Sequence, residues 1–269
     1  MRFEDITNII DEEKVEHDKY YTAPDVAKEC ISKINLNGYD RIIEPSAGNG
    51  SFSKLIPKIE AYDLVPEGPS IKKQDFLKFN TDKGNILVIG NPPFGKNSNL
   101  AIQFINNAAK FARTIAFILP ATFMKESVLK HLDSHVKLSR SYPLNKNSFL
   151  IDGKPYDVNC RFFVFSVLKN ERKEFEDQTT NDFEFTTKEN ADINILRKGW
   201  HVGRIVPKES NISDSSRYFI KSNINHGLLV KRLNSVYENG YENAGYVMGA
   251  DSITKQDVIR GYNKLYGDK

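Results

Sequence analysis

The tetrapeptide Asn91-Pro92-Pro93-Phe94 follows directly after the apolar run 86–90 and combines residue types suited to binding a planar amine. Two consecutive prolines cannot continue a central strand or enter a helix interior, so the chain leaves the sheet in a fixed, extended conformation. A structural turn could use the same residues. The Asn91 amide and the Pro92 carbonyl nevertheless become acceptors beside an aromatic ring, which suits a molecule with an exocyclic NH2 group.

A glycine-containing turn, EPSAGNGSF at residues 44–52, lies where a strand is predicted to end and a helix to begin. Gly48 and Gly50 let the backbone turn sharply and approach a ligand closely. In open α/β sheets, ligands bind outside the carboxyl ends of the strands, where the strand order reverses. Many turns contain glycine for structural reasons alone, so this turn is a weak signal by itself.

Two acidic positions follow the glycine turn in an order that suits adenosine. Asp63 and Leu64 end the next predicted strand, where a carboxylate can accept both ribose hydroxyls of a nucleoside. Asp75 and Phe76, in KKQDFL, could offer a carboxylate to an exocyclic amine and a ring to a purine face. Asp63 could instead be an ordinary strand-end aspartate that caps a turn, but the order of the glycine turn, Asp63 and Asp75-Phe76 indicates an adenosine ligand.

The segments TAPDVA, EPSAGNGSF, YDLVP, QDFL and NPPF occur in this order. Together they resemble the S-adenosylmethionine-dependent adenine-N6 DNA methyltransferases of the gamma arrangement, in which the cofactor motifs precede the catalytic tetrapeptide. The segment NSFLIDGKPYDVNCRFFVFSV is similar to the hairpin that these enzymes place beside the target base. The resemblance spans residues 20–168, and NPPF with EPSAGNG is its specific part.

The resemblance implies a role for each matched position, with S-adenosylmethionine as the cofactor and no metal. The target adenine would be flipped out of the stack, and oxygens of Asn91 and Pro92 would bind its N6. Phe94 would stack on one face of the base and Phe149, or alternatively Tyr156, on the other. The catalytic set is Asn91, Pro92, Pro93 and Phe94. The implied cofactor contacts are Tyr21, Thr22, Glu44, Ala47, Gly48, Gly50, Asp63, Leu64, Asp75 and Phe76.

The elements needed to position these residues are predicted over the first 170 residues, where short apolar runs alternate with amphipathic stretches. The predicted strands are 41–44, 59–64, 86–90, 114–119, 136–142 and 161–168. The predicted helices are 24–34, 51–55, 99–112 and 122–132. This pattern predicts an α/β fold: a doubly wound, mostly parallel, Rossmann-like methyltransferase sheet with a late β-hairpin.

A small C-terminal α+β extension is predicted beyond that sheet, so the expected domains are 1–170 and 171–269. Strands are predicted at 183–186, 200–206 and 218–220, and helices at 227–237 and 255–266. Residues 195–235 carry eight cationic against two acidic residues, interleaved with Trp200 and other aromatic residues. This pattern is typical of nucleic-acid binding but equally of a solvated surface. The candidate nucleic-acid contacts are Lys96, Arg197, Lys198, Arg204 and Lys208.

Composition excludes several classes of protein. The chain has 269 residues, 39% of them hydrophobic and 27% charged, with a net charge of +3. It is therefore expected to be globular and neither collagen-like nor disordered. Apolar runs of about five residues are too short for a membrane helix, and the acidic start lacks a signal-peptide core. Two isolated cysteines, Cys30 and Cys160, favour a reducing, cytoplasmic location.

Alternative functions remain open from the sequence. The preferred partner is DNA, with RNA as the alternative nucleic acid and a protein subunit as a possible source of target recognition. N5 methylation of a protein glutamine would present a similar NH2 group to an Asn-Pro-Pro motif, although that family typically has Tyr in the fourth position. A catalytically silent methyltransferase-like subunit is the third alternative, and it has no need of both NPPF and EPSAGNG.

Overall fold

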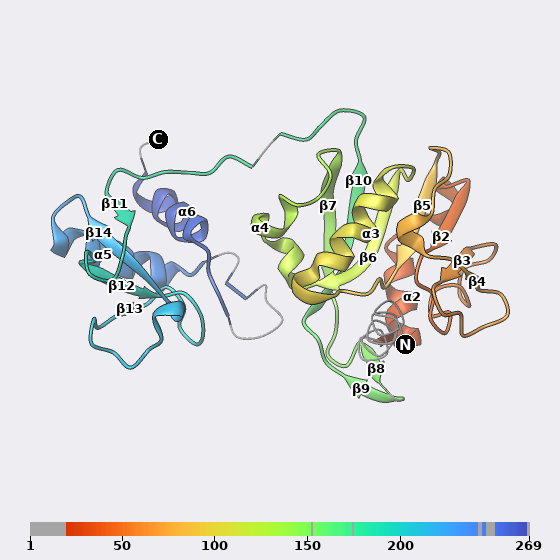
Figure 1. Ribbon diagram of the computed structural model, residues 1–269, viewed down its shortest axis with the longest axis horizontal. Helices are drawn as coiled ribbons and strands as arrows, with labels where there is room; N and C mark the ends of the chain where they lie inside the picture. The colour runs from red at the N-terminus through yellow and green to blue at the C-terminus, as the bar shows by residue number, and fades with distance from the viewer. Residues whose placement is uncertain (1–19, 152, 174, 242–243, 246–250, 268–269) are drawn as a thin grey trace, which may run out of the picture. The chain divides into compact units, whose positions relative to one another are not determined.

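The computed structural model describes residues 20–151, 153–173, 175–241, 244–245 and 251–267, drawn in colour in Figure 1. The chain divides into two compact units. Unit 1 holds the described residues up to Phe123 together with the segment from Ser127 to 173. Unit 2 holds Met124–Glu126 and the described residues from Phe175 onward. Each unit has its own sheet and core.

A seven-stranded sheet forms the centre of unit 1, with the strand order β4-β3-β2-β5-β6-β10-β7. Its first five strands pair in parallel, whereas β10 pairs antiparallel with both β6 and β7. The strands are β2 (Arg41–Glu44), β3 (Glu60–Asp63), β4 (Lys72–Lys73), β5 (Ile86–Gly90), β6 (Thr114–Pro120), β7 (Val136–Pro143) and β10 (Cys160–Val167). The order confirms the predicted α/β class and its late antiparallel pair.

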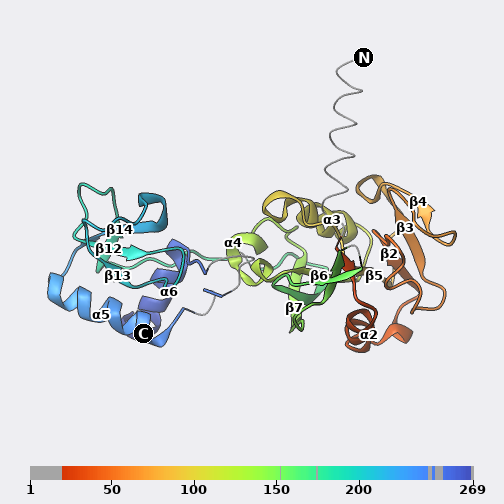
Figure 2. The ribbon, with the colours of Figure 1, turned by 90° about the horizontal axis from the view of Figure 1, so that it is seen from below.

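Helices lie on both faces of this sheet, with α3 above it and α2 below it in Figure 2. Every residue of β5 and β6 is buried, as expected for strands that are covered on both faces. The helix α2 (Pro24–Ser32) packs Val26, Ala27 and Cys30 into the core with alternate residues of β5 and β6. The helix α3 (Asn99–Ala109) contacts β6 and the short helix η2 (Phe76–Lys78).

Two predicted helices of unit 1 are wrong. Residues 51–55 form successive turns rather than a helix, because Pro57 disfavours helical geometry at Ile56 and leaves too short a run. The predicted helix 122–132 is broken into η4 (Ala121–Met124) and α4 (Glu126–Leu129). The remaining short helices of unit 1 are η1 (Leu36–Gly38) and η3 (Lys96–Ser98).

A separate three-stranded sheet joins the start of the described chain to the segment between β7 and β10. It consists of β1 (Tyr21–Thr22), β8 (Phe149–Ile151) and β9 (Lys154–Tyr156), in the order β1-β8-β9. Tyr21 is opposite Leu150, and Thr22 is opposite Phe149. The pairing brings the N-terminal motif beside the segment that was predicted to close over the target base.

Unit 2 is the predicted α+β extension, with a four-stranded sheet in the order β11-β14-β12-β13. Its elements are β11 (Phe183–Phe185), β12 (Ile193–Leu196), β13 (Ile205–Val206), η5 (Asp214–Ser216), β14 (Arg217–Ser222), α5 (His226–Asn239) and α6 (Lys255–Tyr266). Apolar residues of β12, β14, α5 and α6 share one core. A capping box of Thr254 and Asp257 starts α6.

Among the described residues, no helix has the length and apolar character needed to cross a membrane.

Candidate active site

The sheet brings the glycine turn and the Asn-Pro-Pro-Phe segment together at one edge. The strand order reverses between β2 and β5, so their carboxyl ends flank the crevice where open α/β sheets bind ligands. A Cβ atom added to Gly90 at the end of β5 would lie 3.5 Å from side-chain atoms of Glu44 and Pro45. In addition, the Ser46 hydroxyl donates to the Asn91 carbonyl at 3.2 Å.

Asn91 holds its amide in one orientation. Its Nδ2 donates to the carbonyl oxygen of Tyr20 at 2.8 Å. Its Oδ1 is buried and accepts no hydrogen bond from any residue that the structure describes. A buried acceptor without a donor is costly, and each such group calls for an explanation, of which a catalytic or binding role is one. Asn91 therefore presents one fixed acceptor that suits an N–H group of a bound molecule.

Aromatic rings gather beside Asn91. Phe94 is stacked with Tyr20 at a centroid distance of 6.2 Å, and Tyr156 is stacked with the same Tyr20 ring at 5.6 Å. Tyr156 is 44% exposed, whereas Phe94 is buried. Such offset stacking distances are ordinary for aromatic pairs. The two residues predicted for the base faces, Phe94 and the alternative Tyr156, are thus linked through Tyr20.

The prediction for Phe149 is corrected. Its ring is fully buried and packs edge-on against Tyr20 within the core beneath α2. Phe149 begins β8, and alternation along the strand turns its side chain into the core. It cannot stack on a base in this arrangement, which leaves Tyr156 as the exposed ring of the hairpin.

The glycine turn and Asp63 form one hydrogen-bonded loop. Gly48 and Gly50 have φ values of +52° and +88°, which favour glycine. The Gly48 N–H donates to Asp63 Oδ2 at 2.7 Å, and the Val65 N–H donates to Asp63 Oδ1 at 2.8 Å. Each carboxylate oxygen keeps a second lone pair. Asp63 can therefore hold its own loop and still accept hydroxyl groups of a ligand. Ala47 is buried and donates its N–H to the Tyr62 carbonyl at 2.9 Å, which ties the turn to β3.

Apolar side chains next to Asp63 remain exposed. Leu64 and Val65 are 51% and 50% exposed, and both are among the large exposed hydrophobic residues of the described chain. An exposed apolar pair beside an acceptor fits a nucleoside, whose sugar is polar and whose base has an apolar face. Leu64 was predicted as a contact, and Val65 joins it.

Tyr21 and Thr22 reach the same turn from β1. A Cβ atom added to Gly48 would lie 3.3 Å from the Tyr21 ring, so the absence of a side chain at Gly48 leaves room for this ring. The Tyr21 hydroxyl donates to Glu67 at 2.7 Å. The Thr22 carbonyl accepts from Ser51, and Thr22 Oγ1 is buried without a partner in the described part of the chain. Two buried unsatisfied oxygens, on Thr22 and Asn91, thus belong to the candidate site.

Glu44 has a different role from the predicted ligand contact. It is almost fully buried, and its carboxylate accepts the backbone N–H groups of Phe52 at 3.2 Å and Ser53 at 2.8 Å. Burial raises the pKa of Glu44 to about 7, because the charged form loses its hydration. The residue positions the turn from beneath.

The Asp75-Phe76 prediction is also corrected in part. Phe76 is buried and packs against Phe79, Phe104 and Phe111, so its ring belongs to the core and does not face a purine. Asp75 caps η2 by accepting the Leu77 N–H at 3.0 Å and lies 3.4 Å from the exposed Lys78 ammonium. Phe76 is the first residue of η2, and its buried ring lies where η2 contacts α3.

The loop after Phe94 is conformationally strained. Asn97 and Ser98 have positive φ angles of +55° and +63°, and Gly95 has +67°. Left-handed backbone in non-glycine residues is uncommon and tends to occur at functional sites. Lys96 is exposed on this loop, as its predicted role in nucleic-acid contact requires.

The predicted cations of unit 2 differ in their surroundings. Lys198, Arg204 and Lys208 are exposed. Arg197 is only partly exposed, and its guanidinium lies over the Tyr218 ring at 5.1 Å. A cation held on an aromatic face contributes to the packing of unit 2. Only the three exposed cations are free of that packing.

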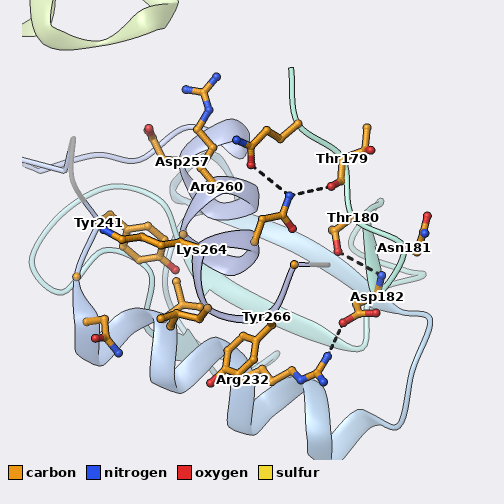
Figure 3. A pocket seen from close by; sticks show the side chains of 18 residues that line it. Thr179, Thr180, Asn181, Asp182, Arg232, Tyr241, Asp257, Arg260, Lys264 and Tyr266 are labelled. Atoms are coloured by element: carbon orange, nitrogen blue, oxygen red, sulfur yellow. Dashed lines mark hydrogen bonds and ion pairs between the residues drawn. The ribbon is translucent and has the colours of Figure 1, made fainter. Parts of the chain in front are cut away.

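A cavity of about 990 Å³ in unit 2 contains none of the predicted residues. Figure 3 shows the side chains that line it, which come from α5, α6, the segment 178–182, and residues 240–241 and 267. Arg232 donates to Asp182 and to the Tyr262 hydroxyl, and the same Asp182 accepts from Tyr262. This network joins α5, α6 and the segment 178–182, whereas the buried hydroxyl of Tyr241 in the lining has no hydrogen-bond partner among the described residues.

Sequence reasoning missed two residues of the site. Tyr20 directly precedes the matched Tyr21-Thr22 pair, and a signal was present because tandem tyrosines start the N-terminal motif. Val65 follows Asp63-Leu64, and an apolar pair before Pro66 at a strand end was also visible. Both could have been found by extending each motif by one residue.

Comparisons with known proteins give distant likenesses. No established protein-family profile matches the sequence. The chain is 28% identical over 156 residues to Protein ENHANCED DOWNY MILDEW 2 of Arabidopsis thaliana. That segment is 50% of this chain but only 12% of the plant protein's length.

Among solved structures, a candidate RNA methyltransferase of Pyrococcus horikoshii aligns at 18% identity and a TM-score of 0.46, covering 57% of this chain and 89% of that chain. A modification subunit of a candidate type I restriction enzyme from Vibrio vulnificus aligns at 13% identity and a TM-score of 0.42. It covers 93% of this chain and 58% of that chain. The strand order of the sheet, rather than these likenesses, identifies the fold of unit 1.

Proposed function

We propose that this chain is an S-adenosylmethionine-dependent methyltransferase that acts on the exocyclic N6 of adenine in DNA. The observation that carries the proposal is the Asn91 amide: Nδ2 is held by the Tyr20 carbonyl, and the buried Oδ1 has no donor among the described residues. The fixed acceptor stands at the carboxyl end of β5, where the fold places ligands.

The residues of the glycine turn fit the cofactor. Asp63 would accept the ribose hydroxyls, and Leu64 and Val65 would cover an apolar face of the adenine. Tyr21, held over Gly48, would border the methionine end. When bound, S-adenosylmethionine supplies an electrophilic methyl group on its sulfonium. The fit rests on the exposed apolar pair beside an acceptor and on Gly48, where a larger residue would crowd the Tyr21 ring.

Asn91 would act by hydrogen bonding rather than by proton abstraction. Its Oδ1, with the Pro92 carbonyl, would accept the two N6–H groups and favour a pyramidal nitrogen whose lone pair is no longer delocalised into the ring. Because the acceptor is already oriented, it needs no reorganisation as charge develops. Phe94 and Tyr156 would hold the plane of the base, with Pro93 fixing the bend between acceptor and ring.

Recognition of nucleic acid would fall to exposed cations. Lys96 lies on the loop that follows the tetrapeptide, and Lys198, Arg204 and Lys208 lie in unit 2. Adenine in RNA is the second substrate that the same chemistry would accept. Phenylalanine at position 94 argues against glutamine N5 methylation, since that family typically has tyrosine there. The intact glycine turn argues against a silent subunit, which would have no need of it.

The proposal is tested by incubating the full chain with radiolabelled S-adenosylmethionine and, in separate reactions, duplex DNA, single-stranded RNA and protein extract. Nucleoside digestion should give N6-methyladenine from DNA. Label found in N6-methyladenine from RNA alone would move the substrate to RNA. Label in protein glutamine, or in no product, would contradict the proposal.

A further inference from the structure

The loop 197–204 of unit 2 displays a tryptophan in water. Trp200 is 88% exposed, although tryptophan is highly buried on average in folded proteins. Burying such a ring gives a large favourable free energy. A strongly exposed tryptophan therefore indicates a surface where binding of a partner that covers the ring would be favourable.

The loop is held in place while its tip stays exposed. The Gly199 N–H donates to the Asp251 carbonyl at 2.8 Å, and the Ile253 N–H donates to the Arg197 carbonyl at 3.0 Å. At the other end, the Gly203 N–H donates to the Leu196 carbonyl at 2.6 Å. The exposure of Trp200 thus belongs to an ordered loop rather than to a frayed end.

Backbone conformations on both sides of Trp200 are specialised. Gly199, His201 and Gly203 have φ values of +109°, +64° and +88°. A Cβ atom at Gly203 would lie 2.0 Å from the Tyr241 ring, so only glycine fits there. His201 is held in its unusual conformation while its Nδ1 contacts the Tyr237 hydroxyl at 3.0 Å. Backbone conformations of this kind tend to cluster at functional sites.

The chemistry around Trp200 identifies its partner. Lys198 and Arg204 flank it and are exposed, and the segment 197–208 contains no acidic residue. One acidic residue, the exposed Asp251, lies on the segment whose backbone is hydrogen-bonded to this loop, through its carbonyl and the Gly199 N–H. Val202 and Val206 are buried, so Trp200 is the large exposed hydrophobic side chain of this loop, with an exposed cation on each side of it in the sequence.

We propose that Trp200 stacks on an unpaired nucleobase while Lys198 and Arg204 contact the neighbouring phosphates. A ring flanked by cations is the arrangement with which proteins bind single-stranded nucleic acid. The inference rests on the proposed function in one respect, namely that the substrate is a nucleic acid. It adds a second contact, in unit 2, to a nucleotide other than the one methylated.

The chain contains a single tryptophan, so fluorescence excited at a wavelength that tyrosine does not absorb reports on Trp200 alone. The full chain is titrated with a single-stranded DNA oligonucleotide, an RNA of the same sequence and a blunt DNA duplex, and binding is followed by anisotropy of a label on each. Stacking should quench Trp200 and protect it from acrylamide with single strands. Quenching by the DNA strand, the RNA strand or both identifies the source of the base, whereas heparin, an anion without bases, should leave the emission unchanged.

Variants of the full chain give the second readout. Trp200→Ala should weaken single-strand binding by roughly 5- to 150-fold, and Trp200→Phe should retain much of it. Leu265→Ala, at a 39% exposed residue of α6, is the matched control and should bind normally. S-adenosylmethionine affinity should be unchanged in all three variants.

Unchanged Trp200 emission in a complex detected by anisotropy would overturn the inference, as would equal quenching by heparin. A response to protein extract without a response to oligonucleotides would also overturn it and indicate a protein partner. These failures are separable from failure of the proposed function. That function fails if no nucleic acid is methylated, whatever Trp200 does, and stands if methylation proceeds while Trp200 is silent.

Discussion

The acidic residues predicted for the cofactor site in unit 1 and the cationic residues predicted for nucleic-acid contact in unit 2 differ in what surrounds them. In unit 1, the carboxylates of Glu44, Asp63 and Asp75 each accept backbone N–H groups of their own loops. In unit 2, Lys198, Arg204 and Lys208 extend into solvent. Acids that shape loops suit a small ligand of fixed form, whereas free cations suit a long anion that is held loosely. The contrast separates the proposed cofactor chemistry from the proposed nucleic-acid contacts.

The largest expected effect tests the tetrapeptide of unit 1. Asn91→Ala removes the oriented acceptor and should lower turnover by about 100- to 1000-fold. S-adenosylmethionine affinity should hardly change, because in the proposed function the lost bonds would be made to the target base. Single-turnover kinetics and calorimetry measure the two quantities. Asn99→Ala, at an exposed residue just beyond the same loop, is the control, and an active Asn91→Ala enzyme would contradict the role.

The next effect concerns the buried carboxylate beneath the glycine turn. The pKa of Glu44 is raised by burial from 4.5 to about 7, so the native state keeps a proton that the unfolded state has lost over this range. The contribution of Glu44 to stability is therefore present below pH 4.5 and is lost as the pH rises to about 7. The loss should be about 3 kcal/mol.

Glu44→Gln removes this titration. Urea unfolding of both proteins at several pH values between 4 and 8 should show the wild-type free energy of unfolding falling relative to the variant. The variant carries a constant penalty, because its amide NH2 cannot accept a backbone N–H. Parallel pH profiles for the two proteins would show that Glu44 does not titrate in this range.

Variants of Asp63 test whether this carboxylate binds the cofactor in addition to holding the loops of unit 1. Asp63→Ala should weaken S-adenosylmethionine binding by about 1.5 to 3 kcal/mol, because a charged acceptor of hydroxyl groups is lost. Asp63→Asn keeps one oxygen and should lose less. Calorimetry on folded variants checks both, with circular dichroism as the control for the two backbone bonds. Unchanged affinity in a folded Asp63→Ala protein would remove Asp63 from the cofactor site.

The smallest effect at physiological salt is expected in unit 2. Changing Lys198, Arg204 and Lys208 together to Ala should weaken duplex binding and flatten the salt dependence by about 0.9 per lost phosphate contact. Arg197 is left unchanged because it packs over Tyr218. Binding is measured at several salt concentrations. If the slope of affinity against salt concentration is unchanged, these residues belong to a solvated surface without a role in binding. The proposed contrast between the two units would then be wrong.

The central sheet could be predicted from the sequence because its buried strands are visible as continuous apolar runs. Ile86–Gly90 and Thr114–Pro120 are continuous apolar runs, and such runs are typical of strands buried on both faces. The short helix after the glycine turn was wrongly predicted because Ser51–Leu55 has apolar residues at a helical spacing, while Pro57 stops the helix. The buried strand Ile193–Leu196 was missed, since Asn194 interrupts its apolar pattern.

Where the structure places the candidate polar residues could be predicted from the sequence, whereas the directions of the candidate aromatic side chains could not. The positions of Asn91, Gly48 and Asp63 follow from motif order, and the sheet brings them to one edge. The direction of an aromatic side chain depends on tertiary packing that no motif contains. Phe76 and Phe149 turned out to be core residues, and Tyr20, which no motif included, packs against Phe94.

The stacking of Tyr20 with Phe94 and Tyr156 sets up a competition. Under the proposed function, a base that stacks on the face of Phe94 next to Tyr20 would have to replace the Tyr20 ring. Its apparent affinity would then be scaled by the fraction of molecules in which that ring has moved away. The group of Tyr20 that accepts from Asn91 is its backbone carbonyl, so this hydrogen bond does not depend on the side-chain rotamer of Tyr20. Loading of the target would then be limited by a rotamer equilibrium, with the catalytic acceptor already in position before the base arrives.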